Sequence, residues 1–340
     1  MKFTRSKKLL FCNNKGGVGK TLLAFNTAVY FAQKGYKTAL IDLDPQCNLS
    51  RLCIGESFEE ENLLPKNRKN IYDVIKGIVE GGSDIDISVK LENTKYTNLF
   101  ILPGSPELSY FESILSNAYN FAASGNRIGY FQTSSIDRFL MQKEIDDGFD
   151  IFVIDTGPSL GILNQIIFLG IDYFVVPMMP SVFSLQGIEK ISKAFDNWKQ
   201  NWQLTAVALS KRNTSNIESK FILSGRGLFI GYIINSYNQY NKKPIKEHQN
   251  WIEKIKTDVV EFFANTHTIN GLSRMIQEPL QIIKDYGQLP ALCDRRGEAI
   301  FDLDEREVRS LEKGTKENLD KSKIEFQSLG NKILSILEKY

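Results

Sequence analysis

The stretch from residue 13 to residue 21, Asn-Asn-Lys-Gly-Gly-Val-Gly-Lys-Thr, constrains the fold of this chain more than any other segment. Directly before it, Leu9 to Cys12 form a short apolar run of the length expected for a buried parallel strand. After it, apolar side chains recur at helical spacing over 21–33, and Gly35 is placed to end that helix. The sequence therefore predicts a strand, a glycine-rich loop and a helix in immediate succession.

A glycine-rich loop in this place is suited to binding phosphate. Backbone N–H groups at a helix N-terminus, together with the helix dipole, favour an anion there. The loop ends in Gly19-Lys20-Thr21, in which Lys20 would reach the β- and γ-phosphates and the Thr21 hydroxyl would bind Mg²⁺. The alternative is a glycine-rich turn with no ligand, and the strand, the helix and the Gly-Lys-Thr together argue against it.

The loop departs from the usual phosphate-loop pattern in two places. Asn14 stands where the pattern asks for a glycine, and Lys15 beside it is a second lysine. Two lysines in so short a loop carry more positive charge than one nucleotide on one chain needs. This surplus indicates a dimer.

Three aspartates follow apolar runs that are typical of buried strands. Asp42 and Asp44 occupy alternate positions at the end of one run, and Asp155 ends another. Ligands of an open parallel sheet bind at the carboxyl ends of its strands, so these carboxylates should converge on the phosphates. For any single aspartate the alternative is a helix N-cap. Acids beside a triphosphate repel it unless a cation lies between them, which indicates Mg²⁺.

The run from Lys15 to Thr21 resembles the deviant Walker A loop of the ParA/MinD superfamily of dimerising ATPases. Further segments match in the family's order, namely 38–46, 150–156, 175–187 and 231–235. The resemblance is greatest to ParA-type partition proteins. It implies an α/β fold with a doubly wound, mostly parallel sheet and helices on both faces.

The resemblance also implies roles for individual residues. Lys15 would reach across a homodimer interface to the partner's nucleotide, and Lys20 would stabilise developing charge. Asp44 would orient the attacking water, and Asp155 would act on Mg²⁺ through water. The expected nucleotide contacts are Lys15, Gly16, Gly17, Val18, Gly19, Lys20, Thr21 and Leu22, with Asn235 at the adenine; the expected metal residues are Thr21, Asp155 and Asp42.

Two positions depart from the family pattern. Leu22 stands where a Thr or Ser usually helps to hold the α-phosphate, so we expect weaker nucleotide binding there. Gly157 stands in the second switch, which usually reads Asp-Thr-Pro-Pro. Glycine makes that loop more mobile, so the coupling of hydrolysis to dimerisation could differ from that of the family.

The length of 340 residues allows one large domain or two. No linker rich in Pro, Gly or Ser divides the chain, so we predict a single ATPase domain over 1–340. Family members that have only the core are shorter. We therefore expect insertions at 55–98, 104–135 and 294–322.

Cysteine and hydropathy patterns indicate a soluble, cytoplasmic protein. The four cysteines form no Cys-x-x-Cys pair, which argues against a zinc site, a disulfide framework or the iron–sulfur branch of the superfamily. The apolar run before Asn13 is too short for a signal peptide, and no stretch approaches a transmembrane span.

The distribution of charge favours DNA as a partner. The net charge is only +2, but residues 187–256 contain twelve Lys or Arg against five Asp or Glu. Such an excess could contact DNA phosphates without reading sequence, although a solvated surface is the equal alternative. The resemblance favours DNA, because ParA-type dimers bind non-specific DNA in the ATP state. That state would be nucleoid-associated, with an adaptor protein stimulating a slow hydrolysis.

The end of the chain distinguishes this function from a second one. Phe326, Leu329, Ile333 and Leu337 recur at helical spacing, as in the membrane-binding helix that ends MinD-type proteins. We instead expect the last helix of the core, because no other helix after Pro290 could cover the sheet. Membrane binding is thus disfavoured. A MinD-like spatial regulator and an assembly or regulatory ATPase with a private protein partner are the alternatives.

Overall fold

The computed structural model describes residues 2–55, 68–82, 84–211, 219–237, 239–240, 243–244, 246–264, 276–311 and 315–340. The strands are β1 Lys7–Phe11, β2 Thr38–Leu43, β3 Glu92–Asn93, β4 Leu99–Leu102, β5 Ile151–Thr156, β6 Tyr173–Met178, β7 Leu228–Tyr237, β8 Gln239–Tyr240, β9 Lys243–Pro244 and β10 Gln281–Lys284. The helices are α1 Lys20–Gln33, α2 Asn48–Ile54, α4 Ile71–Val79, α5 Leu108–Ala123, α6 Arg127–Thr133, α7 Ser135–Asp147, α8 Ile162–Gly170, α9 Val182–Lys211, α10 Lys246–Val259, α11 Leu289–Arg296, α12 Glu305–Arg309 and α13 Thr315–Lys339.

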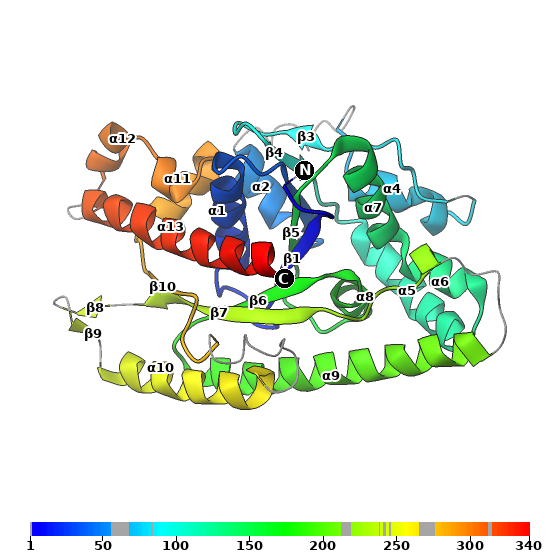
Figure 1. The fold of residues 1–340 in the computed structure, drawn as a ribbon. Coiled ribbons are helices and arrows are strands. Elements are labelled where there is room, and N and C mark those ends of the chain that lie inside the picture. Colours follow the sequence, from blue (N-terminus) through cyan, green and yellow to red (C-terminus); the bar gives the residue numbers. More distant parts are fainter. Residues whose placement is uncertain are drawn as a thin grey trace.

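An eight-stranded sheet in the order β10-β7-β6-β1-β5-β2-β4-β3 forms the centre of the molecule. Every pairing in it is parallel except that of β3 with β4. In Figure 1, α1, α11 and α13 lie on one side of this sheet, and α9 and α10 lie on the other. The predicted doubly wound α/β fold is confirmed.

The central strands are buried on both faces, which is why they read as continuous apolar runs. Every residue of β2, β5 and β6 is buried. β1 pairs with β5 on one side and β6 on the other, and β5 also pairs with β2. The carboxyl ends of β1, β2 and β5 therefore lie side by side, and the predicted site residues follow those ends.

The predicted helix after the glycine-rich loop is α1, which begins at Lys20. It ends as expected: the N–H of Gly35, a residue with φ of 82°, donates to the carbonyl of Ala32 at 2.8 Å. Helix α13 covers the same side of the sheet. Its Phe326, Leu329, Ile333 and Leu337 side chains are 0–1% exposed, so they belong to the core of this fold.

The three predicted insertions can be described only in part. The 55–98 segment contains α4 and β3, but 56–67 lies outside the described residues. The 104–135 segment forms α5 and α6, and 294–322 contains the end of α11, α12 and the start of α13. That they are insertions into a single domain remains a prediction. Within the described part of the chain, no helix has the length and apolar character needed to cross a membrane.

Candidate nucleotide-binding site

The glycine-rich loop turns sharply between β1 and α1. Gly17 and Gly19 have φ of 73° and 82°, a left-handed conformation that favours glycine. Gly19 also has no room for a side chain, because a Cβ there would lie 2.1 Å from Nδ2 of Asn235. Val18 is fully buried and anchors the loop, whereas Gly16 and Gly17 are exposed at its rim.

An open cleft of about 480 Å³ lies along this loop, within the size range of small-molecule sites. Three parts of the chain line it besides Pro158: the loop and the start of α1, the segment from the end of β2 into α2, and the start of α11. Its lining residues are Gly16, Gly17, Gly19, Lys20, Thr21, Leu22, Asp44, Gln46, Asn48, Arg51, Leu52, Pro158, Pro290, Ala291 and Asp294.

Lys20 is held at the floor of this cleft. It is 7% exposed, and its Nζ donates to the carbonyl of Lys15 at 3.2 Å, which bends the side chain back over the loop. Burial lowers the pKa of Lys20, and the nearby Asp155 carboxylate opposes that shift. Among the described residues no carboxylate forms an ion pair with this buried ammonium, so it is well placed to bind an anionic ligand.

Thr21 and Asp155 form the part of the site that suits Mg²⁺. The Thr21 hydroxyl donates to Oδ2 of Asp155 at 2.7 Å, while Oδ1 of Asp155 is buried without a hydrogen-bond partner. The described residues contain no group of three or more His, Cys, Asp or Glu placed to hold a metal. Mg²⁺ commonly binds through one or two carboxylates, with waters and substrate phosphates completing its shell, so one hydroxyl and one unpartnered carboxylate oxygen fit it.

Asp42 has other partners. Its carboxylate accepts hydrogen bonds from the N–H of Asp44 at 3.1 Å and from the N–H and hydroxyl of Ser50 at 2.8 and 2.6 Å. Gly104 packs against it so closely that a Cβ there would lie 2.9 Å from Cγ of Asp42. Asp42 thus ties the end of β2 to α2 and contributes no lining to the cleft. These contacts lend no support to the predicted metal role.

Asp44 lines the cleft. Its side chain is largely buried, and Oδ1 accepts the N–H of Gln46 at 2.9 Å. The backbone of Gly157, at the end of β5, lies directly against it, since a Cβ on Gly157 would be 3.2 Å from Oδ1 of Asp44. The predicted water-orienting residue and the predicted second switch are therefore neighbours.

Lys15 turns toward the start of α9. Its Nζ lies 3.4 Å from the Ser181 hydroxyl and 5.4 Å from the centre of the exposed Phe183 ring. It forms no ion pair with any residue that the structure describes. The ammonium thus lies part-buried beside Ser181 and Phe183, where no described carboxylate neutralises it. Its reach to a partner's nucleotide remains a prediction.

Asn235 and Leu22 lie on either side of the loop. Nδ2 of Asn235, near the end of β7, donates to the carbonyl of Val18 at 2.9 Å, so its amide supports the loop. Its predicted adenine contact remains a prediction. Leu22 is half-buried, packs on the core and contributes to the cleft.

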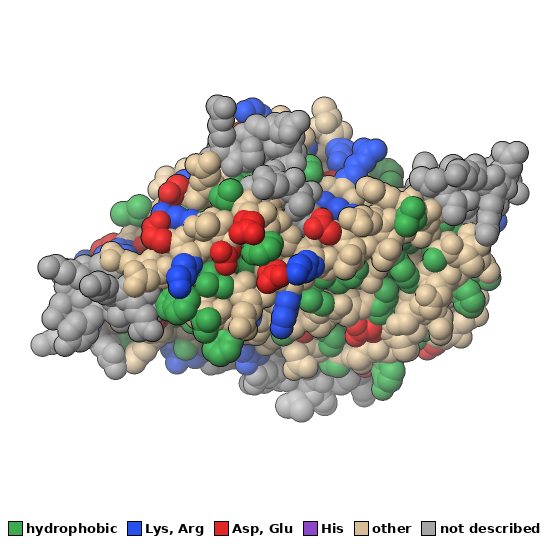
Figure 2. All heavy atoms as spheres, turned by 90° about the horizontal axis from the view of Figure 1, so that it is seen from below, with side chains coloured by type: hydrophobic (Ala, Val, Ile, Leu, Met, Phe, Trp, Pro, Cys, Tyr) green, Lys and Arg blue, Asp and Glu red, His purple; other side chains and the backbone are tan. Residues whose placement is uncertain are grey.

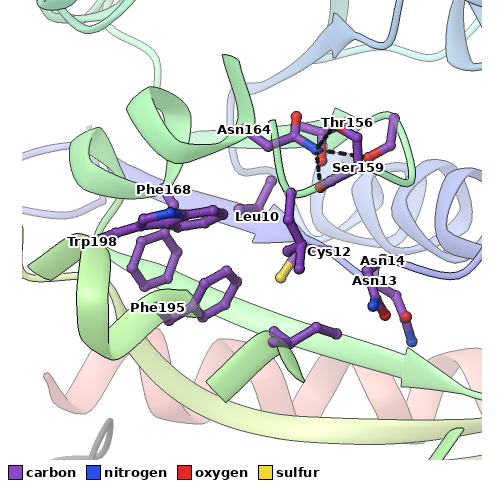
Figure 3. A pocket seen from close by; sticks show the side chains of 13 residues that line it. Leu10, Cys12, Asn13, Asn14, Thr156, Ser159, Asn164, Phe168, Phe195 and Trp198 are labelled. Carbon is purple, nitrogen blue, oxygen red and sulfur yellow. Dashed lines mark hydrogen bonds between the residues drawn. The ribbon is translucent and has the colours of Figure 1, made fainter. Parts of the chain in front are cut away.

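Sequence patterns did not indicate the contribution of α11 or the role of Asn164. The Arg51 guanidinium lies 3.3 Å from the Asp294 carboxylate, which joins α2 to α11 across the cleft. Asn164 lies in a small cavity of about 20 Å³ behind the loop, with room for a water molecule but not for a nucleotide (Figure 3). Asp294 of α11 and Asn164 belong to no local sequence motif, so the spacing of residues gave no indication of either.

The buried Asp155 carboxyl makes the stability of the nucleotide-free protein depend on pH. Burial, followed by repulsion from Asp42, raises its pKa from the ordinary 3.8 to about 8. The folded state thus keeps a proton that the unfolded state releases, and the free energy of unfolding should fall as the pH rises from 3.8 to about 8.

The Asp155→Asn variant tests this expectation. Burial raises the pKa of Asp42 only to about 6, so the fall between pH 6 and 8 belongs to Asp155. Asparagine stays neutral, and the variant should lose that part of the fall in urea unfolding measured at each pH. A variant whose stability falls as steeply as that of the wild type over this range would contradict the assignment.

The basic segment 187–256 is only partly described. Among its described side chains, Lys193 pairs with Glu189, Lys256 pairs with Glu253 and Glu278, and Lys199 is largely buried. Figure 2 shows acidic and basic side chains interspersed on the face formed by α9 and α10. The side chains of Lys211, Arg212, Lys242, Lys243 and Lys246 lie outside the described residues.

Comparisons with known proteins show which family this chain resembles. A family model described as an AAA domain matches residues 6–207. A virulence plasmid ParA family protein of Chlamydia psittaci is 30% identical over 214 residues, which are 62% of this chain and 72% of that protein. The chromosome-partitioning ATPase Soj of Treponema pallidum is 30% identical over 184 residues, 54% of this chain and 60% of Soj.

A solved structure of a Corynebacterium diphtheriae protein shares the fold. It superposes with a TM-score of 0.71 at 24% identity, over 86% of this chain and 97% of that one.

Proposed function

The chain belongs to the AAA-domain family as a ParA/MinD-type ATPase, and from that membership we propose a DNA-partition or cargo-positioning switch that closes as a homodimer on ATP and Mg²⁺. The observation that supports it best is that Lys20, Thr21 and Asp44 line one cleft beside a left-handed glycine loop, with the buried Asp155 carboxyl bonded to the Thr21 hydroxyl. That combination suits a nucleoside triphosphate with its cation.

The proposed chemistry relies on positioning and charge. Lys20 and the loop N–H groups would bind the phosphates, and Thr21 with Asp155 would hold Mg²⁺, which neutralises developing charge in phosphoryl transfer. Asp44, which lines the cleft, would orient the attacking water. Hydrolysis would be slow, as suits a switch, and an adaptor protein would stimulate it.

Lys15 carries the proposal of a dimer. Its ammonium lies on the Ser181 and Phe183 side of the loop, without a carboxylate partner in the described chain. Two subunits that face each other across this side would each offer a lysine to the other's nucleotide. A C2 arrangement satisfies both contacts at once.

Non-specific DNA is the proposed track for the ATP-bound dimer, which would then be nucleoid-associated. The support is that residues 187–256 contain twelve basic and only five acidic residues, together with the similarity to the chromosome-partitioning ATPase Soj. Because Lys193 and Lys256 are ion-paired and Lys199 is largely buried, the other basic side chains of the segment, among them the exposed Lys190 and Lys254, would carry the phosphate contacts.

A gel shift with duplexes of unrelated sequence tests this proposal. We expect binding in low salt with ATP and Mg²⁺, little binding with ADP, and a loss of affinity of about 10³-fold or more when salt rises from 50 to 200 mM, because binding releases counterions. The Lys242→Ala, Lys243→Ala double variant should bind more weakly, whereas Lys193→Ala, at an ion-paired lysine, is the matched control. Equal binding with ATP and ADP, or none at low salt, would contradict the proposal.

A MinD-like membrane regulator is the less favoured function. The apolar side chains that would insert into a membrane, Phe326, Leu329, Ile333 and Leu337, are buried against the sheet, so binding lipid would require α13 to detach. An assembly or regulatory ATPase with its own protein partner would share the same nucleotide site. A purified protein that hydrolyses ATP but binds no DNA would favour that function.

A further inference from the structure

Asn164, in the first turn of α8, is tied to the loop that follows β5. Its Nδ2 donates to the carbonyls of Gly157 and Ser159, both at 2.8 Å, and lies 3.4 Å from the Ser159 hydroxyl (Figure 3). The same loop is drawn together by the Ser159 N–H, which donates to the Gly157 carbonyl at 2.9 Å. One side-chain amide therefore closes the 156–161 loop onto the helix that follows it.

The chemistry of this contact requires an amide donor. Side chains at the third position of a helix commonly accept a hydrogen bond from the backbone N–H of the N-cap residue. Here the bond runs in the opposite direction, since the loop offers carbonyl oxygens and Asn164 offers N–H groups. A carboxylate of the same shape would place negative charge against these oxygens, and an alanine would leave them without this donor.

The 156–161 loop contacts both Asp44 and the phosphate loop of the nucleotide site. Gly157 lies against Asp44, where a Cβ would come within 3.2 Å of Oδ1. Pro158 lines the cleft, and its Cγ lies 3.9 Å from the position of a Cβ on Gly16 of the phosphate loop. The opposite side of the loop faces the cavity of about 20 Å³ and the aromatic side chains of α8 and α9, so there is free volume on that side.

We propose that Asn164 is a positioning residue for hydrolysis, because its amide holds the 156–161 loop against Asp44 and the phosphate loop. The proposal rests on the proposed ATPase function. Without this amide the loop can shift toward the cavity and the Asp44 carboxylate loses its neighbour. Nucleotide binding, which depends on the phosphate loop itself, persists, whereas turnover, which depends on the placement of Asp44, falls.

Steady-state ATP hydrolysis by Asn164→Asp and Asn164→Ala tests the proposal. Both variants should lose about tenfold or more in kcat with KM within about threefold of the wild-type value, as expected when an interaction that matters in the transition state is removed. The control is Gln165→Glu, the same change of amide to carboxylate at the next residue: its side chain contacts Tyr119, and its backbone N–H, which donates to the Gly161 carbonyl, is unchanged by the substitution. It should keep both constants.

Hydrogen–deuterium exchange of the nucleotide-free protein gives a second, independent measure. Amides of residues 157–161 should exchange about tenfold faster in both Asn164 variants, with β1 and α1 unchanged, because the loop opens locally. A kcat within twofold of the wild-type value in both variants would overturn the proposal. Faster exchange throughout β1 and α1 would also overturn it, since Asn164 would then stabilise the whole fold.

The two measurements separate this inference from the proposed function. A wild-type protein that hydrolyses no ATP would refute the ATPase proposal, and exchange at 157–161 would still show whether Asn164 holds the loop. If exchange at 157–161 is unchanged in the Asn164 variants, the positioning role of Asn164 is refuted as well.

Discussion

Asp44→Ala should lower kcat for ATP hydrolysis by about 10²–10⁴-fold, the range typical of losing a group that positions or deprotonates the nucleophile. Asp44 lines the cleft, and its carboxylate accepts a hydrogen bond from the N–H of Gln46. The variant keeps Lys20, Thr21 and the loop N–H groups, so ATP should bind with nearly unchanged affinity. The ATP-bound homodimer should then accumulate.

Light scattering and a phosphate-release assay measure these two effects on the same sample. Asp294→Ala is a useful comparison, because Asp294 lines the same cleft from α11 and pairs with Arg51. Its loss should change nucleotide affinity more than kcat. If Asp44→Ala stays monomeric with ATP, or turns over at the wild-type rate, the water-orienting role is wrong.

Lys15→Ala should bind ATP yet lose about 10³-fold in hydrolysis, comparable to the loss of a charge donated to a phosphoryl-transfer site by a partner. The Lys15 ammonium contacts only the Ser181 hydroxyl and the Phe183 ring among described residues, and no internal ion pair depends on it. The substitution should therefore leave the fold intact. Nucleotide affinity is measured by equilibrium titration and turnover by phosphate release.

A mixture of Lys15→Ala and Asp44→Ala shows whether the lysine acts across the interface. In a mixed dimer, the subunit with Lys15→Ala has an intact Asp44 and receives Lys15 from its partner, so one of the two sites is complete. An equal mixture of freely exchanging subunits should recover roughly a quarter of the wild-type rate, since half of the dimers are mixed. A mixture as inactive as its components would place Lys15 within its own subunit's site.

The sequence anticipated the elements around the phosphate loop because their signals are local. The buried parallel strands β1, β2 and β5 are continuous apolar runs, and α1 begins after Gly19 and ends before Gly35. The edge at which Asp44 and Asp155 meet follows from parallel topology alone. The side-chain contacts of Asp42 cannot be deduced from strand topology, because they depend on Ser50 in the following helix and on Gly104 after β4.

The sequence also could not show whether the basic residues of 187–256 form one exposed basic surface. A count over 187–256 treats twelve basic residues alike, whereas the fold pairs Lys193 and Lys256 with carboxylates and buries Lys199 beside aromatic rings. The apolar stripe at the end of the chain is compatible with a membrane or a core, and the sequence favoured the core only because no other helix after Pro290 could cover the sheet. Only packing of α13 on the sheet distinguished them.

The sequence by itself determined the glycine-rich loop, its two lysines and the aspartates that follow neighbouring strands, because backbone conformation and strand burial are encoded within a few residues. Tertiary structure alone decided which carboxylate oxygen is left unpartnered, which helix completes the cleft and which side chain holds the loop after β5. Asp155 Oδ1, α11 and Asn164 answer these three questions. Each depends on contacts between segments far apart in the chain or on hydrogen-bond direction, and neither leaves a periodic trace in sequence.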